Sequence, residues 1–355
     1  STGRSMRTAA LVVLATLVFA PPAARAETDP GADPCGPPTV AIPEEGIPCS
    51  PARRQRDVWS VVTRGLPDIG SMPNHARPRV ERLGADGCWR RADLEAIFDT
   101  PAQPLLVFIH GNRYDHGSAR EQGLVLAGRA GATCPEVAGA RTVIFSWPSD
   151  KQGILLRDSR AKYERAQSEG HYLAWLLARV EPDRPVAIVG YSYGALIALE
   201  ALEDLVHAQM AGRQGVQPWM GRSAPLHLVL VAAAVRQDAF APCGPYRETL
   251  PCIDRLTVLY NSDDMALRFF ELVDRSLRTE ALGHVGMPAR WLPSGISFLQ
   301  VDAAPVVGCS HRFKKYLASP ALTGRICTGA GRGLCGNEAL PDVAGPLSPE
   351  AGDAP

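Results

Sequence analysis

The 355-residue chain lacks an excess of charge of either sign. Its 37 lysine and arginine residues are balanced by 37 aspartate and glutamate residues. A nucleic-acid-binding protein needs a basic surface to neutralise phosphates, so this balance argues against a nucleic-acid partner. Apolar residues make up 46% of the chain, which is enough for a sizeable core.

The sequence also lacks the common patterns of a zinc site. It contains no Cys-x-x-Cys motif and no pairing of His with Cys at zinc-ligand spacing. No internal repeat is visible either. We therefore expect no metal ion, and nothing in the sequence implies an organic cofactor.

Beyond residue 26 no apolar run is long enough to cross a membrane. The earlier run at residues 9–20, AALVVLATLVFA, follows Arg7 and precedes Ala24-Arg25-Ala26, a small-x-small pattern typical of signal-peptide cleavage. We expect residues 1–26 to be a signal peptide cleaved after Ala26, and the mature protein to be periplasmic or secreted. The alternative is that the run stays attached as a membrane anchor.

Nine cysteines follow that segment, and an oxidising compartment would explain them as disulfides. Spacing alone does not determine which cysteines pair, but short separations favour three pairs. These pairs are Cys35 with Cys49, Cys243 with Cys252, and Cys327 with Cys335. Cys88, Cys134 and Cys309 are left over, and an odd total leaves at least one thiol free or shared with another molecule.

Continuously apolar segments alternate with helical patterns along the middle of the chain. An apolar run such as residues 105–109 is typical of a strand buried on both faces. Strands are predicted at residues 104–110, 142–147, 184–192, 226–235, 255–262 and 296–302, with a shorter one near 58–63. Helices are predicted at residues 118–132, 160–180, 193–210 and 264–277, with a helical turn at 92–98.

This alternation predicts an α/β fold, with a mostly parallel central sheet, helices on both faces and loop-rich termini. We expect a proline-rich N-terminal arm or cap at residues 27–99. The α/β domain would occupy residues 100–320, and a Gly/Pro-rich tail residues 321–355.

Ser192 lies at the junction of a predicted strand and a predicted helix, within the segment IVGYSYGAL. Gly190 and Gly194 allow a sharp turn there, because a Cβ atom at either position would strike the strand or the helix. Such a turn presents the serine hydroxyl to a substrate, and the helix N-terminus directs N–H groups at developing negative charge. The alternative is a packing turn whose serine only caps the helix.

Several segments together resemble a known family. They are VFIHGN (107–112), FSWPS (145–149), GYSYGA (190–195), YNSDDMALR (260–268) and VVGCSH (306–311). The chain resembles the α/β-hydrolases, and among them a bacterial group of serine hydrolases described as a domain of unknown function, DUF900. The likeness covers about residues 100–320. It departs at VAAAV (231–235), where the family has Pro-Asp at a position that is not catalytic.

In such folds a catalytic serine is followed in the chain by an acid and then a histidine. The acid candidates after a strand are Asp263 and Asp264, and the spacing of the resembling family favours Asp264. Either could instead cap the next helix. Only His284 and His311 follow them, and the resemblance places the base at His311. The triad implied is therefore Ser192, Asp264 and His311.

The resemblance also implies an oxyanion hole formed by two backbone N–H groups. The residue after the nucleophile, Tyr193, would supply one, and Asn112 the other. We interpret His110 as a structural brace of that loop rather than as a base.

These expectations describe a secreted serine hydrolase, esterase-like or lipase-like, whose substrate is a small-molecule or lipid ester. It would act through an acyl-enzyme and would need no cofactor. The alternatives are an acyltransferase, thioesterase or peptidase with the same triad, or a binding protein that keeps only the fold.

Overall fold

The computed structural model describes residues 57–151, 155–274, 279–332 and 334. By its contacts the chain divides into residues 1–43 and 44–355, and all described residues belong to the second unit. The predicted signal peptide, the Cys35–Cys49 pair, Cys335 and most of the C-terminal tail lie outside the described residues.

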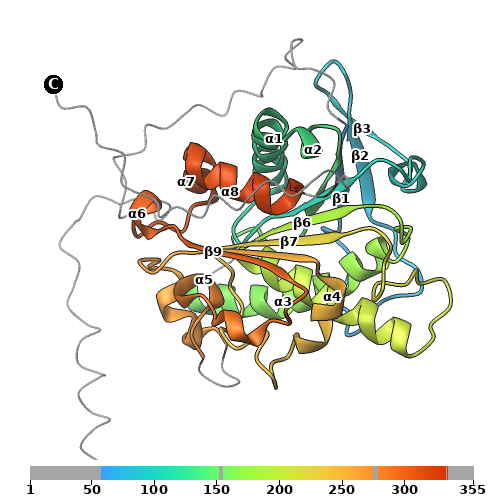
Figure 1. Cartoon of the computed structure of the whole chain (residues 1–355). Helices are drawn as coiled ribbons and strands as arrows, with labels where there is room; N and C mark the ends of the chain where they lie inside the picture. The colour runs from blue at the N-terminus through green and yellow to red at the C-terminus, as the bar shows by residue number, and fades with distance from the viewer. Residues whose placement is uncertain (1–56, 152–154, 275–278, 333, 335–355) are drawn as a thin grey trace, which may run out of the picture. The chain divides into compact units, whose positions relative to one another are not determined.

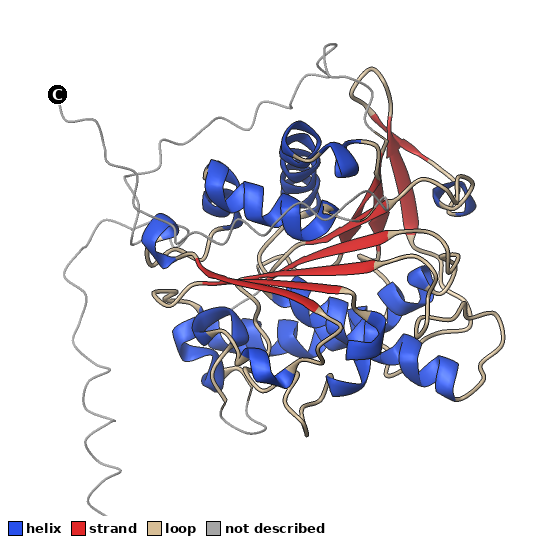
Figure 2. Cartoon of the chain, in the orientation of Figure 1, coloured by secondary structure: helices blue, strands red, loops and turns tan. Residues whose placement is uncertain are grey.

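One sheet of nine strands forms the centre of the described chain (Figure 2). Its spatial order is β3-β2-β1-β5-β4-β6-β7-β8-β9. The pairs β1/β2 and β2/β3 are antiparallel and all other neighbours are parallel. The strands are β1 (Val58–Val62), β2 (Arg79–Leu83), β3 (Trp89–Arg91), β4 (Leu105–Ile109), β5 (Arg141–Ser146), β6 (Val186–Tyr191), β7 (Leu226–Val231), β8 (Arg255–Tyr260) and β9 (Ser297–Asp302).

Helices cover both faces of this sheet, with α1, α7 and α8 on one face and α3 and α4 on the other (Figure 1). The α-helices are α1 (His116–Thr133), α2 (Pro135–Ala138), α3 (Leu155–Leu177), α4 (Tyr193–Met210), α5 (Leu282–Val285), α6 (Ala304–Val307), α7 (Phe313–Ala318) and α8 (Pro320–Gly331). Short 3-10 turns are η1 (Glu95–Ile97), η2 (Arg247–Cys252), η3 (Leu267–Leu272) and η4 (Ala289–Trp291).

The core follows from the apolar runs of the central strands. Every residue of β4, β5, β6 and β7 is buried, as expected for parallel strands covered on both faces. The predicted α/β fold with a mostly parallel sheet is therefore confirmed. Because the parallel strands all run the same way, the segments that follow β6, β8 and β9 meet at one edge of the sheet.

The N-terminal part differs from the expected arm or cap. Strands β1 to β3 belong to the same sheet, because β1 pairs in parallel with β5 over Val58–Val62. At the other end, α8 continues the domain to Gly331. The edges of the sheet domain therefore do not coincide with residues 99 and 320.

Two local expectations are wrong. Over its described part, residues 264–274, the segment predicted as a helix forms the 3-10 turn η3 and no α-helix, and η3 departs from helical backbone angles at Phe269. The Cys243–Cys252 disulfide is absent. Both thiols are free, and Cys243 is exposed whereas Cys252 is buried. Burial raises the pKa of the Cys252 thiol to about 12.

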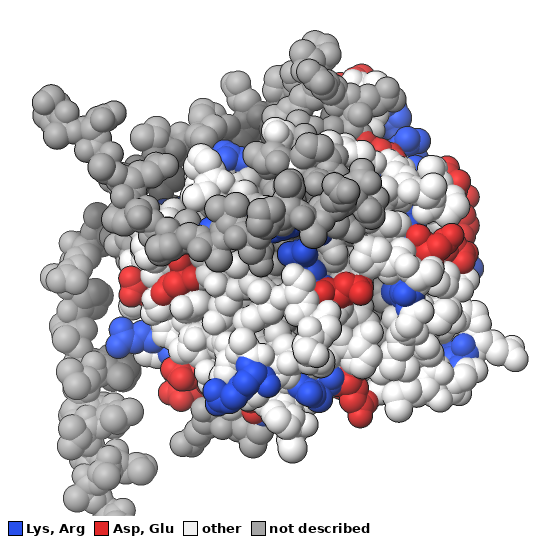
Figure 3. Space-filling model, viewed as in Figure 1, with Lys and Arg blue, Asp and Glu red and all other residues white. Residues whose placement is uncertain are grey.

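The described surface carries charges of both signs. In Figure 3 lysine and arginine side chains are interspersed with aspartate and glutamate side chains and separated by uncharged areas. None of the described helices is long and apolar enough to span a membrane. Within the same residues, no three His, Cys, Asp or Glu side chains are placed to hold a metal ion.

Candidate active site

Ser192 occupies the tight turn between β6 and α4. Its backbone angles are φ 54° and ψ −119°, in a region that residues other than glycine rarely adopt. The turn is held on both sides, because the Ser192 N–H donates to Val231 O (3.0 Å) and Ser192 O accepts from the Ala234 N–H (3.1 Å). The surrounding hydrogen bonds thus maintain a strained backbone that points the hydroxyl away from the sheet.

The two flanking glycines are needed because other backbone atoms approach them closely. A Cβ atom at Gly194 would lie 2.1 Å from Ile109 O, and one at Gly190 would lie 2.8 Å from Gly194 O. No side chain fits at such separations. The predicted reason for the Gly-x-Ser-x-Gly pattern is therefore visible in the packing of α4 against β4 and β6.

Ser192, His311 and Asp264 form a continuous hydrogen-bonded chain. His311 Nε2 lies 2.9 Å from Ser192 Oγ, and His311 Nδ1 lies 2.6 Å from Asp264 Oδ2. With the Nδ1 proton donated to Asp264, Nε2 is left to accept the serine proton. The His311 side chain is 23% exposed and that of Asp264 is fully buried, so solvent reaches the imidazole but not the carboxylate.

Asp264 has two structural roles at once. Its Oδ1 accepts the N–H groups of Ala266 (2.9 Å) and Leu267 (3.0 Å), which starts the turn η3, while Oδ2 contacts His311. Burial alone would raise the pKa of Asp264, but His311 and the two N–H donors outweigh it and hold this pKa below the ordinary value. Asp263, the alternative acid, has an exposed position and is not bonded to His311.

The histidine loop is braced from two strands. The Tyr191 hydroxyl donates to His311 O, and its ring lies 5.3 Å from the imidazole. Asn261, at the end of β8, donates from Nδ2 to Gly308 O (2.9 Å) and Ser310 O (3.2 Å). His284, the alternative base, instead lies beside Asn261 O (3.2 Å). The structure therefore brings His311 to Ser192 and leaves His284 elsewhere.

The loop after β4 lies directly against the serine. A Cβ atom at Gly111 would be 2.9 Å from Ser192 Cβ, so the backbone of this loop borders the hydroxyl. Asn112 follows Gly111 on one side of Ser192, and Tyr193 begins α4 on the other. The first N–H groups of a helix have no partner within it. The two residues predicted to form the oxyanion hole are thus chain neighbours of Gly111 and Ser192, and the role of their N–H groups stays a prediction.

His110 braces this loop. Its Nε2 accepts the Trp147 N–H (3.2 Å), so Nδ1 carries the proton and donates to Gly111 O (2.8 Å). Trp147 Nε1 in turn donates to His110 O (2.8 Å). Complete burial lowers the pKa of His110 to about 3, which keeps the ring neutral. This geometry agrees with the interpretation of His110 as a brace rather than as a base.

Arg64 also supports the loop after β4, a role that the sequence does not predict. Arg64, just beyond β1, donates from Nη2 to Tyr114 O (2.9 Å) and from Nε to Ser146 Oγ (3.1 Å), and it pairs with Asp150. No local motif marks Arg64, because its partners are 50 to 86 residues away in the chain.

With this geometry established, comparison with known proteins identifies the family. The profile of a family described as "Alpha/beta hydrolase of unknown function (DUF900)" matches residues 90–328, which is more than half of the chain. The chain belongs to this α/β-hydrolase family. The predicted resemblance to DUF900 is therefore confirmed, and the family is defined by its fold rather than by a substrate.

Solved structures give only distant likenesses to this DUF900 chain. An inhibited esterase B from Lactobacillus rhamnosis is 13% identical with a TM-score of 0.36, over 76% of this chain and 83% of that one. The thioesterase domain of NocB from a nocardicin cluster is 16% identical with a TM-score of 0.28, over 64% and 91%. Likenesses this distant carry no argument about substrate. Among curated proteins, none matches the chain significantly.

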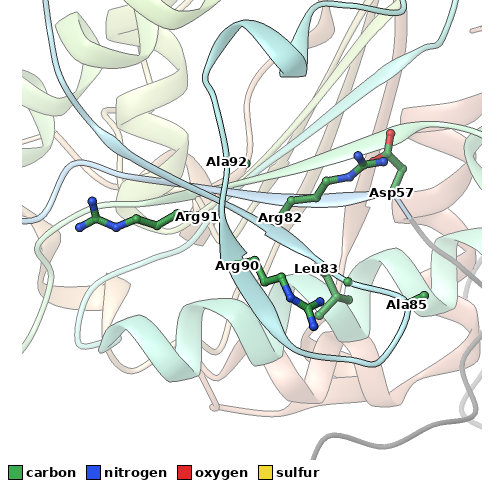
Figure 4. Close-up of a pocket in the computed structure, with 8 residues that line it drawn as sticks. Asp57, Arg82, Leu83, Ala85, Arg90, Arg91 and Ala92 are labelled. Carbon is green, nitrogen blue, oxygen red and sulfur yellow. The ribbon is translucent and has the colours of Figure 1, made fainter.

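A separate cavity of about 530 Å³ lies at the other end of the sheet, around β2, β3 and Asp57. Three of its eight lining residues are arginines, but Figure 4 shows the side chain of Arg91 pointing away from those of Arg82 and Arg90. Arg82 already pairs with Asp57, and Arg90 with Asp86. These guanidinium groups do not converge on one point, so the cavity is not a second candidate active site.

Proposed function

We propose that this DUF900 protein is a serine hydrolase of carboxylic esters. The observation that carries the proposal is the hydrogen-bonded chain from Ser192 Oγ through His311 to Asp264, set on a strained turn at a helix N-terminus. Serine, base and orienting acid within hydrogen-bond reach are the signature of an activated nucleophile.

In this proposal His311 removes the proton from Ser192 as Oγ attacks the ester carbonyl. The N–H groups of Tyr193 and Asn112 bind the oxygen that becomes negatively charged. His311 then returns the proton to the leaving alkoxide, which departs as an alcohol and leaves an acyl group on Ser192. Water, deprotonated by His311, attacks this acyl-enzyme. His311 then returns that proton to Ser192 Oγ as the carboxylic acid is released. Asp264 holds Nδ1 and stabilises the imidazolium throughout.

The proposal is tested with a fluorophosphonate probe on the purified full chain, with the labelled peptide identified by mass spectrometry. We expect the label on Ser192 and no label there in Ser192→Ala. In His311→Ala we expect the labelling rate to fall by about 1,000-fold or more. A panel of ester, thioester and amide substrates then follows on the same preparation.

A folded protein that resists labelling would contradict the proposal and favour a binding protein with this fold. Labelling of a serine other than Ser192 would contradict it as well. Hydrolysis of thioesters or amides without hydrolysis of oxygen esters would support Ser192 as the nucleophile but contradict carboxylic esters as the substrate class.

We also infer that the mature enzyme works in an oxidising compartment, periplasmic or secreted. The small-x-small pattern ending at Ala26 supports this, as do the nine cysteines that follow it in the sequence. N-terminal sequencing of the exported protein is expected to begin at Glu27. An intact N-terminus on a membrane-bound protein would contradict export with cleavage.

A further inference from the structure

Most of the exposed large apolar side chains of the described residues lie in one region. Among the described residues, the large apolar side chains that are more than one-third exposed are Leu156 (37%), Met210 (65%), Met265 (45%), Phe269 (52%), Leu272 (45%) and Val306 (40%). All except Met210 belong to three segments that border the triad, namely the start of α3, the turn after Asp264, and α6 before His311. We call these five residues the apolar rim.

Hydrogen bonds place the first part of the rim beside the histidine loop. Met265 directly follows Asp264, and its N–H donates to Cys309 O (3.3 Å), two residues before His311. Val306 lies three residues before Cys309, in the short helix α6. Met265 and Val306 are therefore both close to the loop that carries His311.

A second contact closes the rim toward α3. Arg160 Nε donates to Leu272 O (2.9 Å), which fixes the end of η3 against the first turns of α3. Leu156 lies four residues before Arg160 and therefore on the same side of that helix. Phe269 lies on η3 between Met265 and Leu272. The rim thus runs from the histidine loop along η3 to α3.

The exposure of these side chains is set by the backbone. The Asp264 carboxylate fixes the start of η3, and Phe269 has the non-helical angles φ −109° and ψ 23°. The same turn buries Leu267 and Phe270 in the core, which leaves Phe269 and Leu272 outside. Apolar side chains grouped at the surface beside a reactive site are typical of a binding surface.

The charges of the rim do not select a charged ligand. On η3 the exposed Arg268 and Glu271 cancel formally, and Arg157 is followed by the buried Asp158. The property that the rim residues share is therefore apolar surface, which an aliphatic chain would cover.

We propose that the apolar rim binds the aliphatic chain of the ester, so that the substrates are medium-chain to long-chain acyl esters. This inference rests on the proposed ester hydrolysis at Ser192. The chain of an acyl group bound to Ser192 Oγ would lie along Met265, Phe269 and Leu272. Each methylene group buried there would add binding free energy.

The test compares p-nitrophenyl acetate with p-nitrophenyl octanoate below the solubility limit, on the purified full chain. Each buried methylene raises kcat/KM by up to about fourfold, so a preference for octanoate of at least roughly 100-fold is expected. The double variant Phe269→Ser, Leu272→Ser is expected to lower the octanoate-to-acetate ratio by about tenfold or more. Met210→Ser, an equally apolar and exposed position at the end of α4, is the matched control and should leave the ratio unchanged.

If the octanoate-to-acetate ratio is unchanged in the double variant, and its thermal unfolding is unaltered, the proposed binding role of the apolar rim is overturned. Equal kcat/KM for the two esters in the unmodified protein would overturn it as well. Absence of hydrolysis of both esters together with absence of fluorophosphonate labelling would instead reject the proposed function itself. The two failures are therefore distinguishable.

A second experiment tests whether the acyl chain comes from a dissolved ester molecule or from a lipid surface. Hydrolysis of octanoate is measured across its solubility limit and with added phosphatidylcholine vesicles. A smooth saturation curve below the limit supports binding of single molecules. Activity that begins only above the limit, and falls in the double variant, supports the same rim acting on aggregated ester.

Discussion

Two groups of serine, histidine and acid occur among the described residues, with similar side-chain distances but different backbone surroundings. In the candidate active site His311 lies 2.9 Å from Ser192 Oγ and 2.6 Å from Asp264. In the second group His116 Nδ1 lies 3.0 Å from Ser146 Oγ, and its Nε2 lies 3.0 Å from Glu81 Oε2.

The second group is built as a structural brace. Ser146 is a fully buried residue of β5, and its Oγ also accepts from Arg64 Nε (3.1 Å). Glu81 is paired with Arg120 as well as with His116. Burial, followed by the charge of Arg120, lowers the pKa of His116, which favours its neutral form. Ser146 itself has no positive φ and does not begin a helix, since it is the last residue of strand β5.

The comparison shows that side-chain distances alone do not define a nucleophile. What distinguishes Ser192 is its backbone at φ 54° and its place directly before α4. Solvent access does not distinguish the groups, because the side chains of His311 and His116 are exposed to a similar extent, 23% and 21%. The two distinguishing features depend on backbone topology, and the Ser146 group has the distances without them. Three substitutions separate the two groups, starting with the largest expected effect.

The acids give the strongest contrast. Asp264→Asn is expected to lower kcat on an acetate ester by about 10,000-fold, because His311 would lose the partner that fixes its tautomer and stabilises its charge. Glu81→Gln is expected to leave kcat within roughly threefold and to lower the free energy of unfolding by about 1–3 kcal/mol, because Arg120 loses a charged partner. Steady-state kinetics and urea unfolding measure both.

A matched control lies one residue away. Asp263→Asn changes an exposed carboxylate that does not contact His311, so its kcat should stay within a few-fold of the unmodified enzyme. A large loss in Asp263→Asn, or a small one in Asp264→Asn, would mean that the acid has been assigned to the wrong residue.

The serines give the second contrast. Ser146→Ala removes an acceptor of Arg64 and a partner of His116, so the free energy of unfolding should fall by about 1–2 kcal/mol. Fluorophosphonate labelling of Ser192 should persist in this variant. Loss of labelling in a folded Ser146→Ala protein would show that the second group takes part in the chemistry.

The last prediction concerns the buried imidazole of His110, which changes stability only below about pH 6.5. Folded His110 stays neutral because its pKa is about 3, whereas in the unfolded chain it takes up a proton below about pH 6.5. The unfolded state therefore binds more protons, and stability falls as the pH drops from about 6.5 toward 3. This group contributes about 1.4 kcal/mol per pH unit in that window.

The difference between the unmodified protein and His110→Gln isolates this contribution, because all other titrating groups are common to both. Urea unfolding at pH 7, 6, 5 and 4 should show a shallower pH dependence in His110→Gln. Parallel curves would contradict the assignment of a neutral, buried imidazole.

Much of the fold was predictable because its signals are local. The apolar runs of β4 to β8 and the glycines around Ser192 can each be recognised within a few residues. The contact of Ser192, Asp264 and His311 follows from the order of strands, since all three follow carboxyl ends of parallel strands. Their catalytic roles stay a prediction until labelling is measured.

The parts that the sequence does not predict depend on distant partners. Arg64 supports the loop at Tyr114 from a segment expected to be an arm, and β1 joins the sheet through pairing with β5. Similarly, the helix expected after Asp264 is replaced by η3, because one carboxylate both starts that turn and holds His311. Neither arrangement has a signature in nearby residues.

The position of β1 between β2 and β5 has a consequence for the order in which the protein can be assembled. Ribosomes deliver residues 58–62 early, yet their parallel partner at residues 142–146 emerges about eighty residues later. Until then both edges of the three-stranded β3-β2-β1 sheet are open, at β1 as well as at β3. The first strands to be synthesised therefore join the parallel sheet only after β5 emerges, and only then can Arg64 reach Ser146 and Asp150.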